Sequence, residues 1–373
     1  MVLCASVAGA QQDPPRRLDL ATEATAPRQD TVGPRNQSTR DLRNRFVRDQ
    51  TVLGFTVYGP AFAVMVGSDG VTGTAGYLVM AGGTFFAAAE ITRHVQITEA
   101  RHLMSSAMAL RTAGSALLIA GQSDMGAKPA AALTLLGGFA GTTSGLVLGR
   151  GLTGGEAAAT IFGHDLAWMT AFALTAAGDS DPFDTTGVDR LTSAVGWTAA
   201  GLGGYFAGNW YARRAQHNVT VGDVQTLWLG ATIGALGGAA TVASSSPNSE
   251  TVASVMLAGG WIGVIGAERF LVRRFDHTRS EGNLLALGGG AGALMGMGVG
   301  ILVSGEADRG GSATLGFATA GAIAGVAMAE RYIQPERDHG RLAFMDRISI
   351  NPGALVAAAA RQPGRHTLLS YTF

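Results

Sequence analysis

The sequence is poor in charged residues, has almost no cysteine, and carries no excess of either sign of charge. Only 14% of its 373 residues are Asp, Glu, Lys or Arg, against roughly 25% in soluble globular proteins, so much of the surface is expected to face something other than water. The net charge is zero, which predicts no nucleic-acid partner. Cys4 is the only cysteine, which excludes an intrachain disulfide and a cysteine-based metal site.

Motifs of catalytic chemistry are also missing. The seven histidines form no His-Glu-x-x-His pattern and no pair four residues apart, so a helical zinc site is not supported. There is no nucleophile elbow and no P-loop, and glycine-rich pieces such as 288–290 lie inside an apolar stretch instead of following a strand. We therefore expect no enzymatic activity, no cofactor and no metal. The sequence does not identify a small-molecule ligand.

Composition divides the chain into four parts. Residues 1–10 are small and apolar and end in Ala-Gly-Ala, as at the end of a secretory signal peptide, although the usual positively charged start is missing. Residues 11–50 lack periodicity and are rich in Pro, Arg, Asp, Thr and Gln, which predicts a disordered linker. We assign residues 51–340 to a repeat domain of helical hairpins and residues 341–373 to a short β-meander.

The repeat domain alternates apolar stretches with short polar joints. Each stretch has about 16 to 22 residues, and about 20 residues of helix match the thickness of a bilayer. The fold class predicted is therefore all-α, with about ten Gly/Ala-rich helices. The ten stretches are 51–66, 74–90, 103–121, 130–149, 156–177, 192–212, 224–243, 252–268, 283–303 and 313–330.

The stretches form repeated pairs with a period of about 55 to 67 residues. One helix of each pair is expected to open with a Thr or Ser as N-cap, followed two residues later by a small residue. The other is expected to end near an Ala-Glu pair, and such repeats bury a face by stacking on their neighbours. The opening pairs are Thr98 and Ala100, Thr153 and Gly155, Thr220 and Gly222, and Ser280 and Gly282; the closing acids are Glu90, Glu268 and Glu330.

Glycines recur every four residues in three of the predicted helices. Residues four apart share one helix face, so each run forms a groove that a neighbouring backbone can approach closely. The pattern resembles the glycine-zipper packing of membrane helices. Strands of an outer-membrane barrel are the alternative, but two-residue alternation is missing. The runs are Gly137, Gly141, Gly145 and Gly149; Gly230, Gly234 and Gly238; and Gly288, Gly292, Gly296 and Gly300.

Two charged residues interrupt the apolar stretches. Arg111 lies thirteen residues after Thr98, and Asp165 lies twelve after Thr153, so equivalent parallel helices would place them at similar depth. A charge at such depth is costly unless it is paired. We expect a buried Arg111–Asp165 ion pair with His164 as a possible third member. It could fasten helices together or form a proton or ion relay, and a single pair favours the fastener.

The polar joints segregate charge. Those on one side hold thirteen arginines, whereas those on the other hold three basic and nine acidic residues. This follows the positive-inside rule for an inner-membrane protein. A cleaved signal peptide would instead place the arginine-rich joints outside the cytoplasm. The two interpretations exclude each other, and the sequence leaves both open.

Alternating apolar residues continue to the last position. Leu369, Tyr371 and Phe373 fall on one face of a predicted final strand. This ending resembles the C-terminal recognition signal of bacterial outer-membrane proteins, and the resemblance covers about eight residues. It implies export toward the outer membrane. An ordinary β-meander packed against the helices is the alternative.

These features together indicate a non-enzymatic structural or scaffold component of the bacterial cell envelope. We expect membrane lipid as its partner and homo-oligomers as a possibility. The C-terminal resemblance favours the outer membrane over the inner membrane. A transporter or channel of the inner membrane, using Arg111, Asp165 and His164, is the first alternative, and a soluble periplasmic solenoid is the second.

Overall fold

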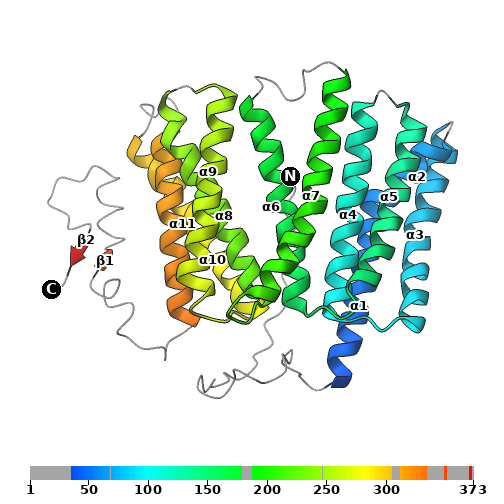
Figure 1. The fold of residues 1–373 in the computed structure, drawn as a ribbon, viewed down its shortest axis with the longest axis horizontal. Helices are drawn as coiled ribbons and strands as arrows, with labels where there is room; N and C mark the ends of the chain where they lie inside the picture. The colour runs from blue at the N-terminus through cyan, green and yellow to red at the C-terminus, as the bar shows by residue number, and fades with distance from the viewer. Residues whose placement is uncertain are drawn as a thin grey trace.

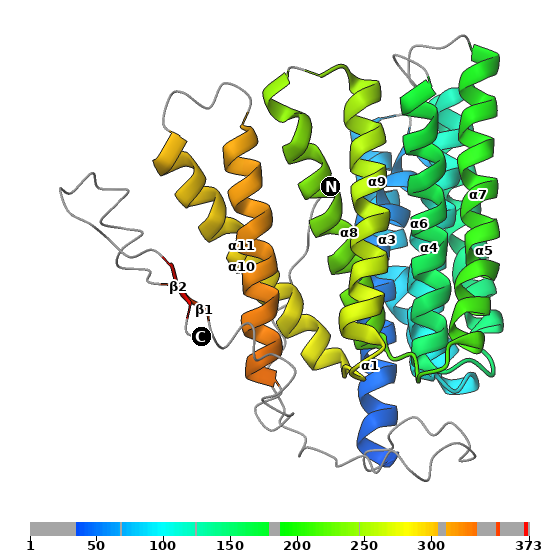
Figure 2. The same ribbon diagram turned by 60° about the vertical axis from the view of Figure 1, so that its left-hand side comes forward.

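The chain is a row of paired helices. The computed structural model describes residues 35–67, 69–123, 125–178, 187–245, 247–304 and 311–333, together with two short strands. Five hairpins follow one another along the row (Figures 1 and 2). They are α2/α3 (Gly59–Val66, Gly70–His94), α4/α5 (Glu99–Gln122, Ala127–Leu148), α6/α7 (Gly154–Gly178, Gly187–Arg214), α8/α9 (Val221–Val242, Ser249–Ala267) and α10/α11 (Arg279–Ser304, Ser312–Ile333).

The all-helical class and the hairpin order are confirmed, and the ten predicted stretches each correspond to one of these helices. Short irregular turns extend three of them: the π-helix η1 (Gly54–Tyr58) precedes α2, the 3-10 helix η2 (Ala243–Ser245) follows α8, and the π-helix η3 (Glu268–Val272) continues α9. Strand β1 (Ile348–Ile350) pairs antiparallel with β2 (Leu369–Tyr371), and Ser349 lies opposite Ser370. The rest of the predicted meander, including Phe373, and residues 1–34 lie outside the described residues.

The predicted linker is wrong for residues 35–50, which form most of helix α1 (Arg35–Leu53). Its sequence is very polar, so local pattern alone did not indicate a helix. Tertiary contacts stabilise this helix. Phe46 is fully buried and packs with Ala88 and Ile97, and Asp49 accepts a hydrogen bond from His102 of α4. Burial against a neighbour stabilises a helix more than intrinsic propensity does.

The predicted N-caps are correct at three helices and displaced at the fourth. Thr98, Thr153 and Thr220 accept bonds from main-chain N–H groups of α4, α6 and α8. At α10 the cap is Thr278, which accepts from the N–H of Glu281, and not Ser280. The small residue of the repeat pattern at this joint is therefore Ser280 itself, because the motif begins two residues earlier than predicted.

Glycine lets the two helices of a hairpin approach until their main chains touch. A Cβ added at Gly234 would lie 2.1 Å from the carbonyl oxygen of Gly259, and one added at Gly292 would lie 2.0 Å from that of Gly321. All the glycines of the three predicted runs face the partner helix of their own hairpin in this way. Each glycine run is covered by another helix of the same chain. These glycines therefore do not form the interface of the homo-oligomer that the sequence left as a possibility.

Large apolar side chains point away from these contacts. Leu287, Leu294 and Leu302 of α10, for example, are all more than half exposed. Seven described helices are long and apolar enough to cross a membrane: α3, α4, α5, α8, α9, α10 and α11, the α8 and α9 spans extending through η2 and η3. These features indicate a membrane-embedded protein in contact with lipid. The helical architecture argues against the predicted preference for the outer membrane, whose integral proteins are typically barrels.

We predict that replacing Gly292 with Leu forces α10 and α11 apart and lowers the free energy of unfolding by roughly 1–3 kcal/mol or more, because overpacking displaces main chain. Thermal unfolding in detergent measures the effect. Gly298 of the same helix has nothing within 4 Å of an added Cβ, so Gly298→Leu is the matched control. Equal melting temperatures for the two variants would refute the packing role of Gly292.

Candidate functional site

Arg111 of α4 and Asp165 of α6 face each other from neighbouring helices. The Arg111 Nε donates to Asp165 Oδ1 at 2.5 Å, and Nη2 donates to Oδ2. This bidentate geometry matches a planar guanidinium to a planar carboxylate. Only 22% of the arginine side chain and 15% of the aspartate side chain are exposed. The structure therefore brings together the two charges that interrupt the apolar stretches.

His164 and Tyr205 complete a cluster shared by α4, α6 and α7. The His164 Nδ1 lies 3.0 Å from Asp165 Oδ1, and its ring lies against that of Tyr205, with centroids 4.5 Å apart. Gly201 makes room for the imidazole, because a Cβ there would lie 2.7 Å from Nε2. Tyr205 is buried, and its hydroxyl has no hydrogen-bond partner among the described residues.

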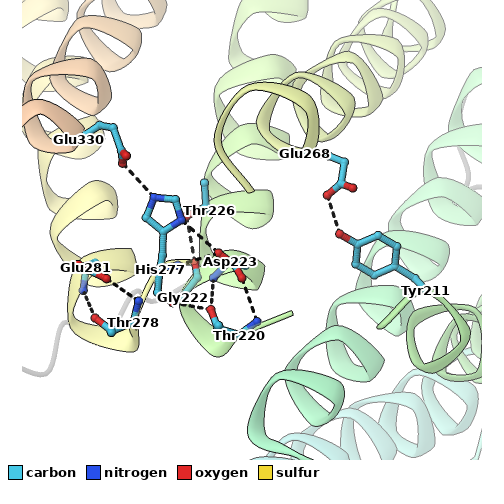
Figure 3. A network of polar contacts seen from close by, with 10 residues as sticks. All are labelled: Tyr211, Thr220, Gly222, Asp223, Thr226, Glu268, His277, Thr278, Glu281 and Glu330. Atoms are coloured by element: carbon cyan, nitrogen blue, oxygen red, sulfur yellow. Dashed lines mark hydrogen bonds and ion pairs between the residues drawn. The ribbon is translucent and has the colours of Figure 1, made fainter. Parts of the chain in front are cut away.

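A second cluster lies on the side of the bundle that carries the arginine-rich joints, which we call the arginine-rich end. It centres on His277 (Figure 3). His277 belongs to the joint before α10 and is 1% exposed. Its Nδ1 and its main-chain N–H lie 3.1 and 3.0 Å from Asp223 Oδ1, and its Nε2 lies 2.9 Å from Glu330 Oε2. One imidazole thus links the start of α8, the joint before α10 and the end of α11.

Asp223 can serve this cluster because a capping box fixes it. Its other oxygen, Oδ2, accepts from the N–H of Thr220 at 2.9 Å, while the Thr220 hydroxyl accepts from the Asp223 N–H at 3.0 Å. The same Thr220 hydroxyl donates to the carbonyl oxygen of His277. Gly222 allows the joint to pass close by, because a Cβ there would lie 2.2 Å from the carbonyl oxygen of Thr278.

The two carboxylates change the electrostatics of His277. Burial alone would lower its pKa, but the bonds to Asp223 and Glu330 and their negative charges raise the pKa to about 9. The imidazole is therefore positively charged at neutral pH and donates from both ring nitrogens. This charge compensates one of the two buried carboxylates.

Two further polar contacts join separate parts of the chain: one joins α1 to α4, and the other joins helices of different hairpins. The His102 Nε2 of α4 lies 2.8 Å from Asp49 Oδ2 of α1. The Tyr211 hydroxyl of α7 donates to Glu268 of η3 at 2.5 Å, and Arg273 holds the other oxygen of that carboxylate at 3.0 Å. Figure 3 includes the Tyr211–Glu268 contact. Each contact ties neighbouring parts of the row together.

Sequence reasoning missed the His277 cluster although its parts were visible. The sequence pattern identifies Thr220 and Glu330 only as repeat markers and gives His277 no role. The useful signal is Thr-x-x-acid at the start of α8 combined with a histidine in the next joint. To use this signal, one must know that the joint before one hairpin packs against the start of the first helix of the preceding hairpin.

No group of three or more His, Cys, Asp or Glu residues in the described part of the chain is arranged to hold a metal ion. No protein-family model, curated protein or solved structure matches this sequence. Each cluster joins helices of neighbouring hairpins through buried polar contacts.

We predict strong coupling between Arg111 and Asp165. Either Arg111→Leu or Asp165→Leu leaves one charge stranded in an apolar setting and should cost about 3–5 kcal/mol, whereas the double variant should cost far less. A double-mutant cycle read from folded yield and melting temperature measures the coupling. Simple additivity would show that the pair contributes no joint stabilisation.

We predict that stability declines in mild alkali because of His277. Its folded pKa of about 9 lies above the unfolded value of 6.5, so its contribution is fully present below pH 6.5 and is lost as the pH rises through about 9. The loss is on the order of 3 kcal/mol, since each pKa unit corresponds to about 1.4 kcal/mol. Melting temperatures of the wild type should fall over this window, while those of His277→Gln should change little. The same pH profile in both proteins would contradict the assignment.

Proposed function

We propose that this chain is a non-enzymatic structural or scaffold component of a bacterial envelope membrane. The observation that carries the proposal is the use of buried or partly buried ionisable side chains to join helices of different hairpins, or α1 to a hairpin. Asp49 with His102, Arg111 with Asp165, and His277 with Asp223 and Glu330 each connect separate parts of the row. Removing one member would strand a buried charge, so such contacts fix one arrangement of the hairpins.

An inner-membrane transporter or channel is the second candidate. One observation favours it: the ring of the buried Tyr205 lies against His164, and its hydroxyl has no hydrogen-bond partner among the described residues. Ionisable groups inside a membrane commonly mark proton or ion pathways. Against this candidate, Asp165 is fully engaged by Arg111 and His164, and a strong ion pair is a poor step for conduction.

Proton flux into proteoliposomes carrying a pH-sensitive dye separates the two candidates. The scaffold proposal expects the wild-type protein to give the same flux as protein-free vesicles under an imposed pH gradient. Tyr205→Phe removes the hydroxyl without breaking any bond recorded among the described residues, and Asp69→Asn, at the exposed cap of α3, is the control variant.

Wild-type flux above that of protein-free vesicles, reduced in Tyr205→Phe but not in Asp69→Asn, would overturn the scaffold proposal in favour of a relay. Size-exclusion profiles and melting temperatures of the same preparations verify that the variants are folded.

A further inference from the structure

Two exposed pairs of an aromatic ring and an arginine recur at the arginine-rich end. The Arg214 guanidinium lies over the Trp210 ring, 5.3 Å from its centroid, and the Arg274 guanidinium lies 5.7 Å from the Phe270 centroid. Both rings are 60% exposed. In each pair the arginine follows the aromatic residue by four positions. One pair lies at the end of α7 and the other at the end of the α9 extension, sixty residues later, which is within the repeat period.

Three acids at this end are turned inward, whereas Glu90 and Asp276 are exposed. Asp223, Glu156 and Glu330 are buried, and Asp223 and Glu330 are held by His277. Exposed arginines outnumber these exposed acids, and four of them have no ion pair within the described chain: Arg150, Arg214, Arg269 and Arg274. The sequence is neutral overall, yet the surface at this end is positive.

Helix α1 adds to the same surface. Its outer end extends beyond the ends of the hairpins on the side of the arginine-rich joints (Figure 1). Arg40, Arg43, Arg45 and Arg48 are all exposed on it. Arg48 pairs with Asp49, while Phe46 anchors the helix against the bundle.

We infer that this arginine-rich end binds the phosphate headgroups of anionic membrane lipids, with Arg214 and Arg274 as principal contacts. Exposed aromatic rings gather at the membrane–water interface; Phe270 lies at the end of the α9 span, and Trp210 lies at the end of α7, which is not among the seven apolar helices. Four residues further along, an arginine reaches the depth of the lipid phosphates and binds them through charge-assisted hydrogen bonds. The inference requires only that the protein is membrane-embedded, so it holds for a scaffold and for a transporter alike.

Retention of lipid from an equal mixture tests this inference. Protein is incubated in detergent with equal phosphatidylglycerol and phosphatidylcholine, washed, and the bound lipids are quantified by mass spectrometry. We expect the wild type to retain phosphatidylglycerol in at least about twofold excess, since each basic residue near an anionic surface adds to binding. The excess should shrink toward an equal ratio in Arg214→Gln/Arg274→Gln and persist in Arg214→Lys/Arg274→Lys, which keeps the charge.

Lys128→Gln, exposed in the first turn of α5 at the opposite end, is the matched control and should retain the full excess. Raising the sodium chloride concentration should reduce the excess in the wild type, a measurement that needs no variant. The inference is overturned by an equal lipid ratio in the wild type, or by the same excess in the Gln double variant.

Discussion

Contact between the main chains of paired helices is the constraint on which this fold depends. Lipid is as apolar as a leucine side chain, so the hydrophobic effect does little to hold helices together within a bilayer. Close packing must act instead, and it is possible where glycine removes the side chain, as at Gly163 against Gly204 or Gly234 against Gly259. Small residues are therefore concentrated inside each hairpin, and large apolar residues are left for the outer faces.

Glycine contacts do not by themselves fix how the hairpins are ordered. Apolar helix faces are similar to one another, so many arrangements of the five hairpins would pack almost equally well. Buried ionisable groups discriminate between them, because each is costly unless it meets one particular partner. Arg111 meets Asp165 between the second and third hairpins, and His277 meets Asp223 and Glu330 between the fourth and fifth. Close packing and polar pairing thus have separate roles.

Features governed by local periodicity could be predicted from the sequence. The hairpin boundaries and the glycine register depend on a helical repeat that is visible in one dimension. The Arg111–Asp165 contact was also predictable, because equivalent helices of a repeat run parallel and place equivalent positions at one depth. Helix α1 was missed because its helical state depends on burying Phe46 against distant residues. The His277 cluster was missed because the path of a joint across the preceding hairpin has no periodic signal.

The one-sided charge of the arginine-rich end follows from the physics of helix termini. A helix that ends there is stabilised by arginines in its last turn, such as Arg213 and Arg214, and the next helix is stabilised by an acid in its first turn, such as Asp223. The acid folds back to cap the main chain, so it is held close to the bundle and is available to a buried histidine. The arginine has a long flexible side chain, and its charge remains in water or at the headgroups while its stem covers apolar surface. Where this unit recurs along the row, exposed arginines come to outnumber exposed acids, so a chain with no net charge presents a positive surface at one end.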